Sequence, residues 1–534
     1  MKERPTVWSV VIRNAASGYL KVLVMMGAAF VVTPVLISEL GTNDYGLWLL
    51  LSAIVGHYLL FDLGFRRALI HDISIRRGQD GEEEIREIVN SFLILFAVIG
   101  VIIVFATCLL AVALPSLFSI RAEQVEEARI ALLLLGIAWA LHLPANIAGG
   151  VLLGYERYDA VNGVDSLMRV ATAVLSILIV TTGHGIATLA VAVAVIQVAG
   201  AVVMMSLAAH FAPSFGLTAR AANPRYLRTA FSRSTSYFVI SINSLVNTRF
   251  DELIIGIVLP LSAVGIYGVS MRLIHMARNV SLQLNEVLIP LTSRLMNNPA
   301  QTHELKAMMV AATRISTGLT AGIALLFIAF GRPFLDLWIG PEVEEAYAPL
   351  VILSVSLVIA MAQDMPAKAV YASARHRTGA TVTIGGLASN VLLSILLVQW
   401  LDIVGVALAT LIAWSGAAVV MIAIGCRLAH LPVVAYVRDA LVPVLAPVLP
   451  AAMLAAGAQA VLPATTWPVL AAECFLAITV YVLASLLLLS SPRELRHFVR
   501  EGAKTLRNRE AAAPVLSGLT SSRRGEEVDV EAVG

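Results

Sequence analysis

The amino-acid sequence predicts an all-α, polytopic integral membrane protein with about fourteen transmembrane helices. The mean hydropathy is +0.85, and 59% of the residues are hydrophobic while only 13% are charged. Such values lie far outside the range of ordinary soluble domains. Apolar stretches of roughly 20 residues, the length that crosses a bilayer, recur between charged or Pro/Gly-rich breaks. The predicted spans are 11–37, 45–66, 88–114, 127–153, 163–181, 186–211, 236–259, 262–290, 309–330, 347–373, 379–399, 403–426, 439–462 and 468–490.

The distribution of cations predicts the orientation of these helices, because loops rich in Lys and Arg face the cytoplasm. The opposite loops hold few cations, chiefly Arg121 and Arg332. We therefore expect a multi-pass protein of the bacterial inner membrane with both termini in the cytoplasm. Four tryptophans mark the other interface: Trp48, Trp338, Trp400 and Trp467. The cations on the predicted cytoplasmic side are Lys2, Arg4, Arg66, Arg67, Arg76, Arg77, Arg86, Arg157, Arg220, Arg225, Arg228, Arg375, Arg377, Arg427 and Arg438.

The two ends of the chain and its cysteines predict no further chemistry. The first apolar stretch is too long for a signal peptide and has no small-residue cleavage pattern, so we expect the first helix to be retained. The tail at 492–534 is basic and then acidic, which predicts a membrane-apposed segment followed by disorder. Cys108, Cys426 and Cys474 lie in apolar runs without metal-ligand spacing, so we expect no disulfide, metal or cofactor.

A weak internal repeat divides the sequence. The segment 40–48, after the first predicted helix, resembles 261–268, after the seventh, and each contains a Tyr-Gly pair that opens a new helix. Transporters built from repeated halves place their substrate site between the halves. We expect an N-terminal six-helix lobe at 1–212, a C-terminal six-helix lobe at 213–438, an extra helix pair at 439–491 and a cytoplasmic tail at 492–534.

Two groups of short motifs occur in the first 300 or so residues. The first group is Asn14, Ser17, Thr33-Pro34, Leu40-Gly41, Tyr45-Gly46-Leu47-Trp48 and Asp62-Leu63-Gly64. The second is Arg249 to Gly256, Val264 to Tyr267, Arg272 and Pro290. In these motifs the chain resembles the polysaccharide and O-antigen flippases of the multidrug/oligosaccharidyl-lipid/polysaccharide exporter superfamily. The rest of the chain is similar only in hydropathy.

The resemblance implies a fold and a function. It implies two helical bundles that form a V around a central cavity, which opens to one side of the membrane at a time. The implied substrate is an undecaprenyl-pyrophosphate-linked oligosaccharide, moved from the cytoplasmic to the periplasmic leaflet for polysaccharide, O-antigen or exopolysaccharide biosynthesis. Membrane lipids, a polysaccharide polymerase and export machinery are the other implied partners. We expect a transporter and not an enzyme, with no nucleic-acid partner.

Three acid–base pairs in the predicted spans are spaced i, i+4 with the acid first, so each pair shares one helix face and can neutralise itself. They are Asp62 with Arg66, Asp165 with Arg169, and Asp364 with Lys368. All three lie toward the predicted cytoplasmic ends of their helices, where long side chains also reach water. The pattern leaves two interpretations open, structural neutralisation or a role in a cytoplasmic vestibule or gate.

Lys21 differs from these pairs, since it lies near mid-depth and has no acid at i±3 or i±4. It must therefore face a cavity or find a partner on another helix. Asn14, Ser17 and Lys21 share one helix face at i, i+3 and i+7, which favours a polar stripe toward a cavity. We predict that all three contact the substrate.

Polar residues on the eighth predicted helix form one continuous face, which contains Arg272, His275, Asn279, Gln283 and Glu286. Arg272 and His275 fall near mid-depth. Arg and Lys are suited to bind phosphate, Arg in a bidentate manner and Lys as a point charge. We predict that Arg272 and His275 bind the anionic headgroup together with Lys21, although a buried polar face that joins neighbouring helices is the plainer interpretation.

The seventh predicted helix has two polar faces. Asn243, Asn247 and Asp251 line one, while Arg249 and Glu252 lie roughly opposite and could pair at i, i+3. If the first face lines the cavity, Asp251 balances a cation there or binds a proton or sodium ion. If the second does, Arg249 joins the substrate-binding cations. The sequence favours the first face only slightly.

Other functions remain open at this stage. A multidrug cation antiporter of the same superfamily would need an acidic cavity, whereas the mid-depth charges here lean positive. An integral-membrane polymerase or glycosyltransferase would need catalytic groups in a large aqueous loop. The longest external stretch, 331–346, offers little room, and no nucleophile, metal or phosphate-loop motif stands out. The sugar and the driving force cannot be derived from the sequence.

Overall fold

The structure is a computed structural model that describes residues 7–62, 65–77, 81–212, 215–216, 250–286, 288–296, 299–373 and 376–489. All regular elements in these ranges are helical, and no strand occurs among them. The first set of helices is α1 (Val7–Gly56), α2 (Phe65–Arg77), α3 (Glu82–Leu117), α4 (Val125–Gly154), α5 (Tyr158–Thr181) and α6 (Ile186–Phe211). The second is α8 (Leu261–Glu286), α9 (Ile289–Met296), α10 (Thr302–Trp338), α11 (Tyr347–Ala372), α12 (His376–Leu428), α13 (Val433–Tyr436), α14 (Val442–Leu445), α15 (Val448–Val461) and α16 (Trp467–Leu489). Short 3-10 helices lie at His57–Asp62, Ala122–Gln124, Pro299–Gln301 and Pro341–Ala346, and a π-helix lies at Val437–Leu441.

Ten helical stretches in the described part of the chain are long and apolar enough to cross a membrane. Two of them contain a residue with positive φ, Gly41 in α1 and Asp402 in α12. At both points the sequence predicts a break between two spans, so α1 and α12 each consist of two limbs. The predicted all-α, polytopic membrane fold is confirmed, while the count of fourteen spans stays a prediction.

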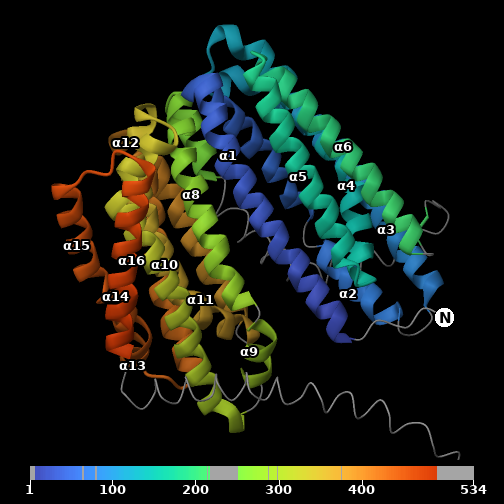
Figure 1. Ribbon diagram of the computed structural model, residues 1–534. Helices are drawn as coiled ribbons and strands as arrows, with labels where there is room; N and C mark the ends of the chain where they lie inside the picture. The colour runs from blue at the N-terminus through green and yellow to red at the C-terminus, as the bar shows by residue number, and fades with distance from the viewer. Residues whose placement is uncertain are drawn as a thin grey trace, which may run out of the picture.

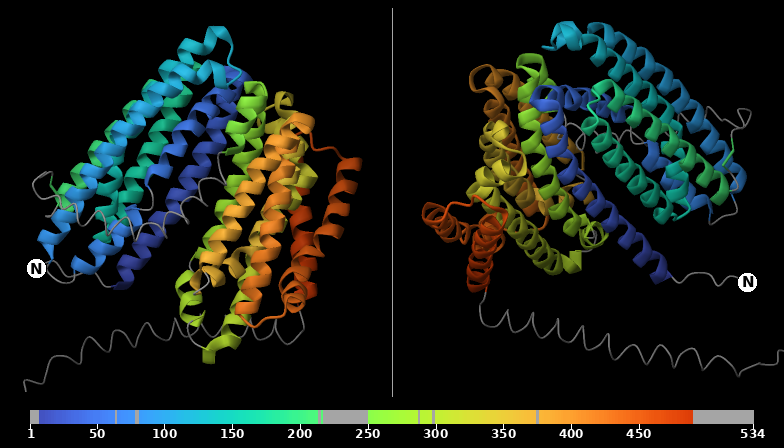
Figure 2. Two further views of the ribbon diagram at one scale, coloured as in Figure 1. Left: turned by 180° about the vertical axis from the view of Figure 1, so that it is seen from behind. Right: turned by 45° about the horizontal axis from the view of Figure 1, so that its top comes forward.

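The helices form two groups (Figures 1 and 2). We call α1–α6 the N-bundle and α8–α16 the C-bundle. The groups meet at the upper end in Figure 1 and diverge toward the lower end, where α1 begins. Because the first limb of α1 ends at Gly41, we call the upper end the Gly41 end. Helices α15 and α16 lie on the outer side of the C-bundle, away from the N-bundle (Figure 1).

The main contact between the bundles joins α1 to α8, and glycines make it close. A Cβ atom at Gly46 would collide with the carbonyl oxygen of Leu261, and one at Gly265 with the carbonyl oxygen of Thr42. The two glycines belong to the two repeated segments of the sequence. Their missing side chains let the backbones of α1 and α8 touch, as small residues do at helix interfaces in membranes.

Aromatic side chains extend this contact at the Gly41 end. The Phe30 ring of α1 stacks on Trp338 of α10 with ring centroids 5.1 Å apart. The Trp338 Nε1–H also donates a hydrogen bond of 3.0 Å to the Phe30 carbonyl oxygen. Phe334, one turn before Trp338, meets Trp467 of α16 with centroids 6.0 Å apart. The contact therefore links the N-bundle, α10 and the C-terminal helix α16, and we call it the aromatic contact.

Candidate functional site

Lys21 in α1 forms an ion pair with Asp165 in α5. The predicted partner of Asp165 was Arg169, one turn along the same helix. In the structure Asp165 instead neutralises a cation 144 residues away in sequence, because α5 packs along α1. Both side chains remain about one third exposed, 29% for Lys21 and 33% for Asp165. The expectation that Lys21 faces either a cavity or a partner is thus answered in this conformation by a partner.

Three further polar groups lie around this pair, and sequence reasoning missed two of them. His142 of α4 interacts electrostatically with Asp165 and with Arg66 of α2. Its Nδ1 lies 3.3 Å from the Gln197 carbonyl oxygen of α6. Within the described part of the chain, Arg66 Nε and Gln197 Oε1 are buried and have no hydrogen-bond partner. We call these five residues the N-bundle cluster.

His142 and Gln197 were missed because each is a lone polar residue in an apolar run. A pattern of i, i+3 and i+4 spacings detects polar groups on one helix. It cannot detect a cluster to which five helices contribute one residue each. The only signal in the sequence was the presence of a polar residue in a membrane span. Such a position is energetically costly, which makes the residue a functional candidate.

Asp251 is the centre of a hydrogen-bond network in the C-bundle. Tyr267 of α8 donates its hydroxyl to Asp251 Oδ2 at 2.6 Å. Thr410 of α12 donates to the same oxygen at 3.3 Å, and Asn390 Nδ2 donates to the Thr410 hydroxyl at 2.9 Å. The network therefore joins Asp251 to α8 and, through Thr410, to both limbs of α12. Ser394, one turn after Asn390, is buried and its hydroxyl has no partner in the described part.

Arg272 lies where the bundles meet. Its guanidinium interacts with the hydroxyl of Tyr45 in α1 and with the carboxylate of Glu252. Tyr45 is fully buried, at 0% exposure. Tyr45 and Tyr267 are the tyrosines of the two repeated Tyr-Gly segments, so each repeat directs one phenol toward a charged group. His275, one turn after Arg272, is half-buried and also interacts with another residue.

The predicted pair of Asp364 and Lys368 in α11 is confirmed, with Nζ and Oδ2 2.6 Å apart. Asn285 of α8 donates a second hydrogen bond of 2.8 Å to the same carboxylate oxygen. Arg278 of α8 also interacts electrostatically with Asp364. This acid therefore balances cations from two helices, its own and α8.

Several predicted site residues cannot be placed. Arg249, Asn243 and Asn247 lie outside the described residues, and so do the side chains of Asn14, Ser17, Asp62, Gln283 and Glu286. Arg169 is described and exposed. The structure therefore tests neither the Asp62–Arg66 pair nor the choice between the two faces of the seventh span.

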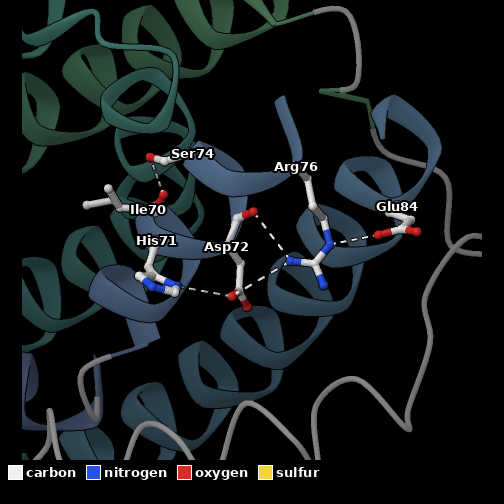
Figure 3. A network of polar contacts seen from close by, with 6 residues as sticks. All are labelled: Ile70, His71, Asp72, Ser74, Arg76 and Glu84. Atoms are coloured by element: carbon white, nitrogen blue, oxygen red, sulfur yellow. Dashed lines mark hydrogen bonds and ion pairs between the residues drawn. The ribbon is translucent and has the colours of Figure 1, made fainter. Parts of the chain in front are cut away.

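A separate polar network ties α2 to the start of α3 (Figure 3). Asp72 is only 4% exposed, and it pairs with His71 at 3.4 Å and with Arg76 at 3.7 Å. Arg76 Nε also donates to Glu84 of α3 at 2.8 Å. This network lies at the end of the N-bundle opposite Gly41. The network fixes the turn between α2 and α3. It also neutralises Arg76 within the protein, so this cation does not need to face the substrate.

The arrangement supplies charge and hydrogen bonds between helices. Among the described residues, no group of three or more His, Cys, Asp or Glu side chains could hold a metal ion. Membrane-spanning helices with ionisable groups between them mark a pathway for a polar solute or ion. The fold and the site thus define the class as a polytopic membrane transporter.

Known proteins are similar to this chain in sequence and in fold. Residues 39–348, more than half of the chain, match the family described as polysaccharide biosynthesis protein. A Shigella flexneri protein named "Putative O-antigen transporter" is 20% identical over 380 residues, which cover 70% of this chain and 87% of that protein. The structure of the lipid II flippase MurJ in an inward closed conformation has a TM-score of 0.71 and 13% identity, and covers 91% of this chain and 100% of its own.

A second solved structure supports the same fold. An inward-facing multidrug resistance MATE family transporter of the MOP superfamily has a TM-score of 0.64 at 18% identity, and covers 76% of this chain and 94% of its own. The chain therefore has the fold of MOP-superfamily transporters. It belongs to the polysaccharide biosynthesis protein family, and the resemblance to polysaccharide flippases is confirmed.

Proposed function

We propose that the protein carries an oligosaccharide linked to undecaprenyl pyrophosphate from the cytoplasmic to the periplasmic leaflet of a bacterial inner membrane. Membership of the polysaccharide biosynthesis family supports the saccharide, and the named O-antigen transporter and lipid II flippase support a lipid-linked form. The substrate moves by alternating access. The polymerase and export machinery that use the product are its natural partners.

The observation that carries this proposal is the pair of cations Lys21 in α1 and Arg272 in α8. One lies in the N-bundle and the other where the bundles meet, and neither has an acid at i±3 or i±4 on its own helix. A pyrophosphate brought into the membrane needs its charge matched. A hydrogen bond between charged groups contributes about 1.5–3 kcal/mol. His275, Asn14, Ser17 and Arg249 complete the proposed substrate-binding set.

The orientation follows from the positive-inside rule. Arg76, Arg157 and Arg427 lie at helix ends opposite Gly41, and we propose that this end is cytoplasmic. Because the bundles diverge toward it, the conformation described is the one that takes up substrate from the cytoplasmic leaflet. The Gly41 end is then periplasmic.

Asp251 is the proposed coupling group. Its carboxylate accepts hydrogen bonds from Tyr267 and from Thr410, and Thr410 belongs to a helix that is long and apolar enough to cross a membrane. A buried carboxylate of this kind can bind a proton or a sodium ion. The pairs of Asp62 with Arg66 and of Asp165 with Arg169 were predicted as gate residues, and Arg66 and Asp165 keep that proposed role through the N-bundle cluster.

The test removes each cation, and for Lys21 it neutralises the paired acid as well. We compare Arg272→Gln with a double variant, Lys21→Gln with Asp165→Asn, because Lys21 has a partner that must be neutralised with it. Each should reduce saccharide display at the cell surface about tenfold or more at matched protein levels, the loss expected for one charged hydrogen bond. Lys21→Arg and Arg272→Lys should retain part of the activity, since the charge survives.

The exposed cation Arg427 provides the control, and Arg427→Gln should transport normally. Normal transport by both cation variants would contradict the proposal. The multidrug cation antiporter of the same superfamily would then become the leading interpretation, since it does not need a positive site.

A further inference from the structure

The ion pair of Lys21 and Asp165 is accessible rather than sealed in the core. About one third of each side chain is exposed, although the helices that carry them pack side by side. A fully enclosed ion pair would leave no surface for a second anion, whereas part of each side chain is uncovered here. The exposed edge lets another anion approach Lys21.

Asp165 also has other cations within reach. Arg169 lies four residues further along α5, a spacing at which an acid and a following base share one helix face. Arg169 is exposed and forms no ion pair with any described residue. On the other side, Arg66 and His142 belong to the same cluster, and His142 interacts with both Arg66 and Asp165. One carboxylate therefore serves an excess of positive charge.

We propose that Asp165 is an exchangeable counter-ion. It neutralises Lys21 while the transporter is empty, and it moves to Arg169 when a phosphate of the substrate takes its place at Lys21. This inference rests on the proposed function. In it, Asp165 and Arg169 act through Lys21, because they control when Lys21 is available to the phosphate. The observed pair and the pair suggested by the spacing of the sequence are then the two states of one carboxylate.

The exchange has a physical reason at each step. A phosphate that binds Lys21 beside a fixed Asp165 would meet a like charge, and movement of the carboxylate to Arg169 removes that repulsion. When the substrate leaves, an unpaired Lys21 in the membrane is costly. The return of Asp165 neutralises it, so the empty transporter can change conformation. Asp165 should therefore weaken binding and speed the empty return step, while Arg169 should strengthen binding.

The experiment measures the affinity of the purified full-length protein for undecaprenyl pyrophosphate in nanodiscs. Asp165→Asn should bind this lipid about tenfold more tightly, because Lys21 is then always available, and a competing partner lowers apparent affinity by the fraction of time it occupies the site. Arg169→Gln should bind about threefold more weakly, the size expected for an exposed ion pair. Arg427→Gln should bind like the unmodified protein.

The double variant, Asp165→Asn with Arg169→Gln, is decisive. Without the Asp165 carboxylate, Arg169 has no partner to draw away from Lys21 and should no longer affect the binding affinity. The double variant should therefore bind as tightly as Asp165→Asn alone. A double-mutant cycle of this form isolates the coupling between the two residues. Transport by Asp165→Asn should be slower despite its tighter binding, a combination that a merely structural pair would not produce.

Two kinds of failure can be told apart. If the unmodified protein does not bind undecaprenyl pyrophosphate, the proposed function is wrong and the exchange falls with it. If it binds, but Asp165→Asn binds equally or more weakly, or Arg169→Gln weakens binding equally in both backgrounds, only the exchange is overturned. Arg169→Gln leaves the observed ion pair intact, so its affinity remains informative even if Asp165→Asn inserts poorly.

Discussion

Tyr45 and Tyr267 show at the residue scale how the repeated Tyr-Gly segments are used. Both side chains are fully buried, which removes their hydroxyls from water and requires a polar partner for each. Tyr267 donates its hydroxyl to Asp251, whereas the Tyr45 hydroxyl interacts electrostatically with Arg272 and has no hydrogen-bond partner among the described residues. The repeat was visible in the sequence, but its two phenols serve charges of opposite sign.

The hydrogen bond from Tyr267 to Asp251 should contribute measurably to stability. Tyr267→Phe removes the closer of two donors to a carboxylate, and hydrogen bonds to charged groups contribute about 1.5–3 kcal/mol. We expect a clear fall in the unfolding temperature in detergent. The control is Tyr371→Phe, whose hydroxyl meets the neutral Thr383 hydroxyl at 2.7 Å and should cost less. Equal losses in the two variants would contradict a special role for the Asp251 network.

Glu473 of α16 is a second residue with a testable consequence. Its side chain is 7% exposed and accepts one hydrogen bond of 3.2 Å from Gln459. Its other carboxylate oxygen is buried without a hydrogen-bond partner in the described part. An isolated buried charge is unfavourable in a membrane.

Glu473→Gln should therefore raise the unfolding temperature, because the amide oxygen can still accept from Gln459 and no charge is buried. The exposed Glu304 gives the control, and Glu304→Gln should leave the temperature unchanged. A lower unfolding temperature in Glu473→Gln would mean that the carboxylate has a stabilising partner in the membrane.

Individual ion pairs divide into those that the sequence could predict and those that it could not. Asp364 and Lys368 lie on one helix, and their i, i+4 spacing was enough to predict their ion pair. The same rule applied to Asp165 gave Arg169, whereas the structure pairs Asp165 with Lys21. Only the packing of α5 against α1 brings those two side chains together.

At the scale of elements, the contact of α1 with α8 depends on Gly46 and Gly265. Neither position has room for a Cβ atom, because the carbonyl oxygens of the opposite helix occupy that space. Backbone atoms cannot move aside as a flexible side chain can. The two helices could meet at this distance only with glycine at both positions.

Gly46→Val should separate α1 from α8 and reduce transport strongly. Forcing extra atoms into a packed interface typically costs about 1–3 kcal/mol, so the closed Gly41 end should lose stability. The matched control is Gly416→Val in α12, where a new Cβ would have nothing within 4 Å. The rate of saccharide display for the two variants checks this. Similar rates would show that the close contact of α1 and α8 is not needed.

The breaks between elements were predicted in position but not in form. Hydropathy placed a boundary between the first two spans and another between the eleventh and twelfth. In the structure, each turn contains one non-helical residue with positive φ, 79° at Gly41 and 48° at Asp402. Glycine adopts this conformation without strain, but nothing in the sequence marked Asp402 for it. The span predicted at 439–462 also begins earlier, at Val433, with a π-helix at Val437–Leu441.

On the scale of the whole molecule, the aromatic contact at the Gly41 end holds the bundles together in this conformation. Phe30 belongs to the N-bundle and Trp338 to the C-bundle, and they share both a ring stack and a hydrogen bond. In the proposed alternating-access cycle, the bundles separate at this end when the substrate is released. The proposal therefore predicts that the contact breaks once in each transport cycle.

A cross-link between these positions should stop transport. We would introduce Phe30→Cys and Trp338→Cys into a chain whose three native cysteines are replaced, and join them with a short bifunctional thiol reagent. Saccharide transport should be lost on cross-linking and recover when a cleavable linker is reduced. Each single-cysteine variant, treated alike, serves as the control. Undiminished transport by the cross-linked protein would contradict a required separation at the Gly41 end.

The sequence by itself determined the membrane class, the positions of most spans, the repeated Tyr-Gly segments and the family. These depend on hydropathy and on local motifs, which are properties of neighbouring residues. The tertiary structure alone decided which polar and charged groups meet. Examples are Lys21 with Asp165, Tyr45 with Arg272, and Asp251 with Thr410. Such contacts join residues far apart in the chain, and they depend on which helices pack together and at what rotation. A helical period gives the faces of one helix, but only packing determines which other helix each face meets.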